Sequence, residues 1–461
     1  MSFENDHQEC LKKLIWAMEE LHIDFEMAQL QKIANLIVQT MTGPWRSFHT
    51  PEHIFEVGGS DNAIELLAAL FHDVVYVQVD KSVNFNLSFY IVHFVKEVRE
   101  QLFVRDRDEL PEDQTFEMIL DLFGFQPGQA LSSFSGQNEF LSAIVGAKVL
   151  EPFLSPQQLV EIICCIETTI PFRPDDDQGL SAAMKLFNRL QAVNQKYDLG
   201  LGQTNLEDTI RRAIRLSNRD VGSFANPSPA RFLDGTWDLL PETNHNLHNR
   251  SSYTVAEYRQ ALQKMEGFMN FLKPEIIFQR FMGEPSEQDY ATLISQSEHN
   301  LQVGRLYLGC KLFTIGFLEA ISRRLGRDIP VSSMMGELPS QGDEELRSKL
   351  IDYIPEIDSA FPLKDEIEEE VLDLLEKGRC QSASYDLKNS PLATYIVKSI
   401  GFDAVRHQCD RSKLFFRGEL TQEQFLEGVN PEITLTVIKG ITKLFEQRQA
   451  SLSKIMPVMT A

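Results

Sequence analysis

The sequence predicts an all-α protein. Along each long patterned segment, apolar residues recur every three or four positions, as they do on one face of an α-helix. We find no convincing run that alternates between apolar and polar residues with the period of two expected for a half-buried strand. Since 43% of the 461 residues are apolar, the chain is long enough and apolar enough to form two or three cores.

Residues 4–42 are expected to form two amphipathic helices. Leu14 and Met18 mark the apolar face of the first helix. Ile33 marks that of the second, which follows a cap at Asp24. We expect both helices to pack in front of the histidine-rich segment that comes next.

Segment 45–76 holds three of the ten histidines. Within it, Thr50 and Pro51 predict a helix start, because threonine can cap a helix and proline fits the first helical position. Gly58 then ends this short helix. Residues 62–71 predict a second helix that is apolar almost all round and must therefore be buried.

An imidazole and a carboxylate, His72 and Asp73, stand side by side at the end of this buried helix. Unpaired buried charge is costly, so such groups are usually neutralised or bound to a metal ion. The preceding short helix carries His53 in its first turn. A lone histidine on an apolar face is more often a core residue, but a cation shared by His53, His72 and Asp73 would satisfy all three groups.

Two motifs in this segment resemble the core signature of the HD superfamily of metal-dependent phosphohydrolases. They are H-T-P-E-H at 49–53 and A-L-F-H-D-V-V-Y at 69–76. The first motif also distantly resembles the H-N-x-x-H opening of cyclic nucleotide phosphodiesterases, with Thr50 in the place of their asparagine. The resemblance implies an HD-domain helical bundle. Residues 77–81 contain no counterpart of the family's second-metal histidine, which favours a single ion.

The resemblance also implies roles for the residues of the two motifs. His53, His72 and Asp73 would bind one divalent metal ion, together with a distant aspartate. His49 would contact the phosphoryl group or protonate the leaving group, so His49 and Asp73 are the candidate catalytic residues. Imidazole and carboxylate ligands are compatible with Mn, Fe, Co, Ni, Zn or Mg.

The distant aspartate is expected to be Asp220. The sequence I-R-R-A-I-R-L-S-N-R-D-V-G-S-F-A at 210–225 resembles the closing segment of the family. A capping box formed by Thr204 and Glu207 predicts a helix over 206–224, with Asp220 near its buried face.

Asp198 and Asp208 are alternative candidates for this ligand position. Asp198 lies in a glycine-rich loop. Asp208 lies in the first turn of the predicted helix, where the helix dipole already favours an acid. Asp220 remains the preferred residue of the three.

Segments farther along the chain are assigned by the same periodicity. Segments 87–95 and 159–170 predict apolar helices, whereas 105–116 predicts a charged loop. Glu167 and Thr168, near the end of the second helix, are candidates for contacts with the site or with substrate. A capping role before the next proline is the more common one for such residues.

The formal net charge of −23 argues against polymeric nucleic acid as a partner, because nucleic-acid binding depends on clustered Lys and Arg residues. A small phosphorylated molecule needs only a local positive pocket. Arg46, Lys81 and Arg219 are the candidate residues for substrate binding.

We expect neither a membrane partner nor export. No stretch reaches about 18 uninterrupted apolar residues. The six cysteines include no C-x-x-C pair, a usage that suits the reducing cytoplasm.

The chain is expected to divide near residue 250. Residues 1–250 would form the HD-type domain, and the loop-rich stretch 227–250 would lead out of it. Residues 251–461 would form a helical region of unknown role, and a linker near 328–343 would split it. This C-terminal region contains very acidic helices and could bind a protein partner.

The leading functional hypothesis is therefore a cytoplasmic metal-dependent phosphohydrolase that acts on a small phosphorylated substrate such as a nucleotide. In this reaction, water activated by the metal ion would attack phosphorus. The alternative is a non-catalytic HD scaffold or regulatory protein that binds a nucleotide or a protein partner.

Overall fold

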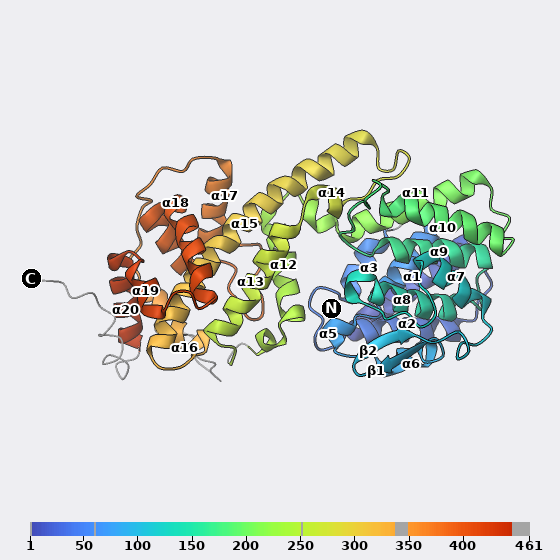
Figure 1. Cartoon of the computed structure of the whole chain (residues 1–461), viewed down its shortest axis with the longest axis horizontal. Coiled ribbons are helices and arrows are strands. Elements are labelled where there is room, and N and C mark those ends of the chain that lie inside the picture. The colour runs from blue at the N-terminus through green and yellow to red at the C-terminus, as the bar shows by residue number, and fades with distance from the viewer. Residues whose placement is uncertain (1, 60, 250–251, 337–348, 445–461) are drawn as a thin grey trace, which may run out of the picture. The chain divides into compact units, whose positions relative to one another are not determined.

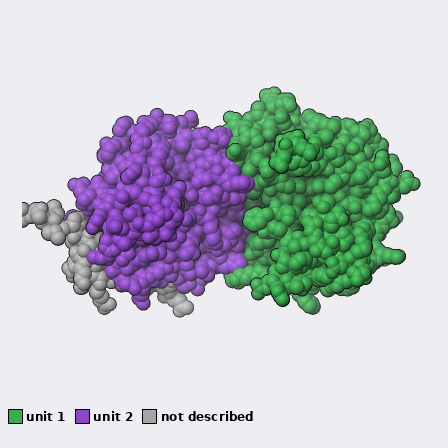
Figure 2. All heavy atoms as spheres, in the orientation of Figure 1, with its two compact units in different colours: residues 1–225, 273–296 green, residues 226–272, 297–461 purple. Residues whose placement is uncertain are grey.

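Helices account for most of the residues that this computed structural model describes, which are 2–59, 61–249, 252–336 and 349–444 (Figure 1). The helical fold class is confirmed. The described chain forms two compact units, each discontinuous in sequence (Figure 2). Unit 1 comprises Met1–Ala225 and Lys273–Gln296, and unit 2 comprises Asn226–Leu272 and Ser297–Ala461.

Unit 1 contains most of the predicted helices of the N-terminal half. Its elements are α1 (Phe3–Glu20), α2 (Met27–Met41), α3 (Pro51–Gly58), α4 (Ala63–His72), α5 (Val77–Asp80), α6 (Phe85–Ile91), β1 (Val95–Val98), β2 (Gln101–Val104), α7 (Gln114–Phe123), η1 (Ser133–Ser135), α8 (Gln137–Leu150), α9 (Pro156–Thr168), α10 (Ala182–Lys196), α11 (Gln203–Asp220), η2 (Gly222–Ala225) and α14 (Pro274–Ile277).

The two helices of the histidine-rich segment begin close to where the sequence predicts. α3 starts at Pro51, although the Thr50 hydroxyl makes no capping hydrogen bond. α4 is capped by Asn62, whose side chain accepts a hydrogen bond from the backbone N–H of Glu65. Every residue of α4 is buried, because the helix packs against α1, α3, α8 and α9. The end of α4 is therefore held firmly in the core of unit 1.

A β-hairpin replaces part of the predicted helix 87–95. α6 ends at Ile91, and β1 then pairs with β2 in an antiparallel ladder. Arg99 and Glu100 form the turn with φ of 54° and 65°, the left-handed conformation that two-residue hairpin turns require. The prediction missed this turn because neither residue is the Gly, Asn or Asp that usually occupies it.

Unit 2 contains the helices of the C-terminal half and part of a long helix that begins in unit 1. Its elements are α12 (Pro229–Thr243), η3 (His245–His248), α13 (Val255–Phe271), α15 (Glu287–Arg324, of which 297–324 belong to this unit), α16 (Val331–Met335), η5 (Leu350–Tyr353), α17 (Glu366–Glu376), α18 (Pro391–Phe416), α19 (Gln422–Glu427) and α20 (Pro431–Leu444).

The observed units do not divide at the predicted position. Residues 250 and 251 lie outside the described residues, and unit 2 already begins at Asn226. The segment Lys273–Gln296 returns to unit 1, where Phe281 is 4% exposed and joins its core. Gln279 exchanges hydrogen bonds of 2.8 Å with the side chain of Asn218. These long-range contacts make a division at residue 250 incompatible with an intact unit 1.

The linker predicted near 328–343 lies only partly within the described residues, because 337–348 are outside them. Its described part contains the short helix α16, Val331–Met335. In the described part of the chain, no helix is both long enough and apolar enough to cross a membrane.

Candidate metal centre

Three helices bring four potential metal ligands together. α3 carries His53, α4 ends at His72 and is followed by Asp73, and α11 ends at Asp220. Their candidate ligand atoms all lie within 4.8 Å of one another. α9 packs against both α4 and α11, so it joins the elements that carry these residues.

The separations between these atoms suit ligands of one shared cation. His72 Nε2 lies 2.9 Å from Asp73 Oδ2 and 3.3 Å from Asp220 Oδ1. His53 Nε2 lies 3.1 Å from Asp220 Oδ1 and 3.5 Å from Asp73 Oδ2. Ligands bound at about 2.1 Å are about 3.0 Å apart at adjacent octahedral positions and about 3.4 Å apart in a tetrahedron.

The hydrogen bonding of His72 also fits a metal ligand. Its Nδ1 donates to the carbonyl oxygen of Ala69 over 2.7 Å, which leaves Nε2 to face the two aspartates. A second hydrogen bond of this kind is the usual way in which proteins orient a metal-binding imidazole. With two imidazoles and two carboxylates, the site matches the donor chemistry of a divalent transition metal or magnesium ion.

The four groups perturb one another strongly in the absence of a cation. Burial disfavours the charged form of His53, but hydrogen bonds to Asp220 and Asp73 raise its pKa to about 9. The same carboxylates raise the pKa of His72 well above its usual value, against the effect of burial. Although burial opposes this shift as well, the imidazoles lower the pKa of Asp220 to about 2. Protons on the two imidazoles thus provide the positive charge that a metal ion would replace.

The position of Asp220 agrees with the preferred prediction, whereas the two alternatives lie elsewhere. Asp198 is exposed, and Asp208 forms a surface ion pair with Arg211. Neither belongs to the metal-ligand cluster among the described residues.

The predicted course of α11 needs correction. The helix begins after an N-cap at Gly202 and ends at Asp220, instead of starting from a Thr204 capping box and continuing to 224. Asp220 is therefore the last residue of the helix, and its side chain reaches toward α3 and α4.

His49 lies beside the cluster, in the loop before α3. Its ring centroid is 5.7 Å from that of His53 and 4.5 Å from that of Tyr76, with both pairs edge to face. Burial raises the pKa of Asp73. The charge of His72 and, to a smaller extent, that of His49 lower it, and the pKa lies well below its usual value. This position is compatible with the catalytic role predicted for His49.

Arg46 supports the site from behind. Its side chain is fully buried and forms an ion pair with Asp80, with Nη2 and Oδ2 2.7 Å apart. Its Nη1 donates to the backbone carbonyl of Asp73 over 2.7 Å, and its Nη2 donates to that of Val74. With its donors engaged in this way, Arg46 positions the loop at Asp73, and its role in substrate binding stays a prediction.

The other two predicted substrate-binding residues differ in their surroundings. Lys81 is exposed, and its ammonium group lies over the Trp45 ring, 5.0 Å from the centroid. Arg219 precedes Asp220 and lines a cavity of about 590 Å³ together with His53 and Asp220. Arg219 donates to the carbonyl of Val57 and pairs with buried Glu65 over 2.7 Å.

The far wall of this cavity comes from the segment that returns to unit 1. Glu284 lines it and pairs with Arg215 over 2.9 Å. Arg215 also pairs with Glu65 over 2.7 Å, so Glu65 holds both Arg215 and Arg219 at the edge of the cavity. No local sequence pattern points to Glu284, because it lies far along the chain from the two motifs.

Two further acidic residues near the site have contrasting environments. Glu167, a candidate from the sequence, is buried and binds Arg173 and Arg189 over 2.7 and 2.6 Å. Glu139 on α8 was missed. Burial, aided by the charges of Asp73 and Asp220, raises its pKa to about 8. Its Oε2 is buried without a hydrogen-bond partner among the described residues. A glutamate within a predicted apolar helix was the only sequence signal that could have found it.

Comparison with known proteins adds no relative. No family model matches the chain, and neither a curated protein nor a solved structure matches it at a significant level.

Proposed function

We propose that this chain is a metal-dependent phosphohydrolase that acts on a small phosphorylated molecule such as a nucleotide. The observation that carries the proposal is the convergence of His53, His72, Asp73 and Asp220 from three helices into one cluster. The two sequence motifs that resemble the HD superfamily supply the first three of these residues, and the closing segment supplies the fourth.

His53, His72, Asp73 and Asp220 would hold one divalent cation. Such a cation supplies Lewis acidity toward phosphoryl oxygens and lowers the pKa of a coordinated water. The two carboxylates provide the negative charge that favours a cation at this place. The Ala69 carbonyl keeps the Nε2 atom of His72 directed at the site.

The surrounding residues would bind and orient the substrate. His49 lies close enough to the cluster to exchange a proton with a leaving oxygen. Arg219 would contribute positive charge at the cavity edge, where Glu65 and the Val57 carbonyl fix its guanidinium group. Phe48, whose ring centroid is 5.0 Å from that of His53, gives the same cavity an apolar face.

The test compares metal content and hydrolysis in matched variants of α11. The full chain is purified, stripped of metal, reloaded with Mn, Mg, Ni, Co or Zn, and assayed on phosphomonoesters and phosphodiesters. Asp220→Ala should weaken metal binding by at least the roughly 10- to 100-fold seen for residues that only support ligands, and hydrolysis should fall with it. Asp208→Ala, on the surface of the same helix, should change neither quantity.

Two results would contradict the proposal. Stoichiometric metal without turnover of any phosphoester would favour the alternative of a non-catalytic scaffold that binds a nucleotide or a protein partner. Equal metal content in the Asp220→Ala and Asp208→Ala variants would remove Asp220 from the site. The cytoplasmic location and a protein partner for the C-terminal half stay predictions.

A further inference from the structure

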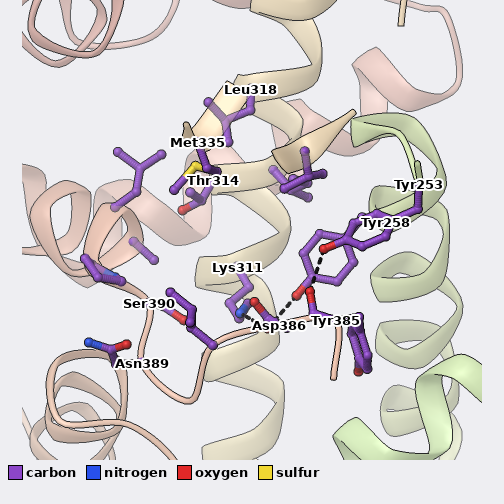
Figure 3. A pocket seen from close by; sticks show the side chains of 16 residues that line it. Tyr253, Tyr258, Lys311, Thr314, Leu318, Met335, Tyr385, Asp386, Asn389 and Ser390 are labelled. Carbon is purple, nitrogen blue, oxygen red and sulfur yellow. Dashed lines mark hydrogen bonds and ion pairs between the residues drawn. The ribbon is translucent and has the colours of Figure 1, made fainter. Parts of the chain in front are cut away.

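A second cavity is lined only by residues of unit 2, none of which belongs to the candidate metal centre. Its volume is about 100 Å³. α13, α15 and α16 line it together with the segment 385–393, and Figure 3 shows the side chains that face it. Most of this lining is aromatic or aliphatic, including Ile315, Leu318 and Met335. The cavity is therefore a candidate binding site for a small, largely apolar molecule.

Three tyrosines line the wall, and their hydroxyl groups bind other atoms of the protein. Tyr253 donates to the carbonyl of Tyr385 over 2.7 Å, and Tyr385 donates to the carbonyl of Trp237 over 2.6 Å. Tyr258 donates to Asp386 over 2.8 Å. All three tyrosines are almost fully buried. The fixed ring of Tyr258, which lies beside Lys311 and Asp386 in Figure 3, favours a flat ligand that can stack on it or meet it edge to face.

One carboxylate at this wall, that of Asp386, has an oxygen that accepts no hydrogen bond from the described residues. Trp237 Nε1, Tyr258 Oη and Lys311 Nζ all donate to Oδ2 of Asp386, over 2.7, 2.8 and 2.6 Å. Among the described residues, no donor reaches Oδ1. Burial alone would raise the pKa of Asp386, but the charges of Lys311 and Arg379 lower it below its usual value. Asp386 is thus an ionised acceptor with one unused oxygen.

Lys311 supplies a donor beside this acceptor. Its ammonium group carries three N–H bonds, and within the described part of the chain Asp386 is the one hydrogen-bond acceptor that it reaches. The Nζ atom lies over the rings of Trp237 and Tyr258, 5.2 and 5.9 Å from their centroids. Figure 3 shows Lys311, Asp386 and Tyr258 meeting at one side of the cavity. The wall therefore offers a donor and an acceptor on neighbouring atoms.

We propose that this cavity binds a planar, single-ring lactam, which carries an N–H group next to a carbonyl group as a pyrimidine-type ring does. The ring N–H would donate to Asp386 Oδ1, and the ring carbonyl would accept from Lys311 Nζ. The tyrosine rings and the aliphatic side chains would enclose the rest of the ring.

The size of the cavity supports a single ring. An engineered protein cavity of about 150 Å³ binds benzene, so a cavity of about 100 Å³ limits the enclosed part of a ligand to no more than a single ring. A metal ion is disfavoured here, because Lys311 and Arg379 already balance the charges of Asp386 and Asp234. This proposal is independent of phosphohydrolase activity.

The test uses the intact chain and three small probes of similar size. They are 2-pyridone, which carries the adjacent N–H and carbonyl groups, 1-methyl-2-pyridone, which lacks the N–H group, and benzene, which lacks both. Binding is measured by ligand-observed saturation-transfer NMR titration. We expect 2-pyridone to bind with a dissociation constant on the order of 1 mM, as suits so small a ligand. The other two probes should bind at least about tenfold more weakly, because Asp386 or Lys311 is then left unpaired.

Two variants locate the binding site. Lys311→Met removes the donor and should weaken 2-pyridone about tenfold, whereas Lys413→Met, a lysine paired with Glu266 elsewhere in unit 2, should not. Val331→Phe should fill the cavity without touching either polar group, and it decides the question if Lys311→Met does not fold. Equal binding of 2-pyridone and its methyl derivative, no binding at all, or full binding to Val331→Phe would each overturn the proposal.

Discussion

The two units each contain a cluster of buried charge, and the clusters differ in the source of their positive charge. In unit 1, Asp73 and Asp220 face His53 and His72, whose positive charge is a proton that can leave. In unit 2, Asp386 faces Lys311 and Arg379, which are cationic at neutral pH, and Arg379 also pairs with Asp234.

This difference decides what each cluster can bind. When the two imidazoles lose their protons, two carboxylates remain with two neutral nitrogen ligands, which is a receptor for a divalent cation. The positive and negative charges of the unit 2 cluster stay balanced at neutral pH. The cluster can therefore form hydrogen bonds with a ligand, but it has no excess negative charge that would bind a cation. Counting acidic residues alone would not separate the two sites.

Substitution of the two neighbouring histidines should have the largest effect. His53→Ala removes a ligand, so we expect loss of both metal and hydrolysis. His49→Ala should keep the metal and lower the rate of hydrolysis about 100- to 10,000-fold, as loss of a general acid does. Metal analysis and initial rates on the same preparations check this. Equal metal loss in both variants would make His49 a ligand.

Metal affinity should rise with pH in unit 1. Because the pKa of His53 is about 9 without metal, a cation must displace its proton at neutral pH. We expect a gain of about tenfold per pH unit for each proton displaced, ending as the pH passes about 9. Calorimetric titration with Mn between pH 6.5 and 8.5 measures this gain.

The stability of the metal-free fold should depend on pH in the opposite direction. The raised pKa of His53 stabilises that state below pH 6.5, and this stabilisation is lost as the pH rises toward 9. An affinity that does not change with pH would contradict the assigned ligands.

Removal of the unit 2 carboxylate should affect stability but not metal content. Asp386→Asn leaves Lys311 without its ionic partner and weakens the bonds from Trp237 and Tyr258. We expect a loss of about 1–3 kcal/mol in the free energy of unfolding, measured by denaturant titration. Metal occupancy should match that of the unmodified chain. A drop in occupancy would mean that the cation does not reside in unit 1 alone.

Removal of the N-terminal cap of α4 should give the smallest effect. Asn62→Ala removes the side chain that accepts from the N–H of Glu65 at the start of α4. The expected cost is about 1 kcal/mol in unfolding free energy, read from the thermal midpoint. Because His72 lies at the opposite end of a fully buried helix, metal affinity should stay within a factor of two, on the order of experimental scatter. A large loss of metal would show that the position of His72 depends on this cap.

The parts of the structure that the sequence predicts correctly depend on local signals. Pro51 marks the start of α3, and Asn62 with the apolar run behind it marks α4. These two helices fix where His53, His72 and Asp73 lie along the chain. Asp220 could be chosen over Asp198 and Asp208 only because its segment resembles the closing segment of the HD superfamily. Periodicity alone does not say which distant helix supplies the fourth ligand of a site.

The parts that were missed depend on contacts between residues far apart in sequence. The burial of Arg46 follows from its ion pair with Asp80 and from two backbone carbonyls, none of which a charge count reveals. The return of Lys273–Gln296 to unit 1 depends on the packing of Phe281 and the pairing of Gln279 with Asn218. Such contacts are set by tertiary packing and leave no periodic pattern.

The central claim is that one divalent cation is shared by residues of α3, α4 and α11. Anomalous X-ray diffraction from crystals of the Mn- or Zn-loaded chain tests it most directly. We predict one strong peak in unit 1, about 2.0–2.2 Å from His53 Nε2, His72 Nε2 and carboxylate oxygens of Asp73 and Asp220. A peak bound by other residues, or a metal-loaded structure in which Asp220 points away from the ion, would contradict the account.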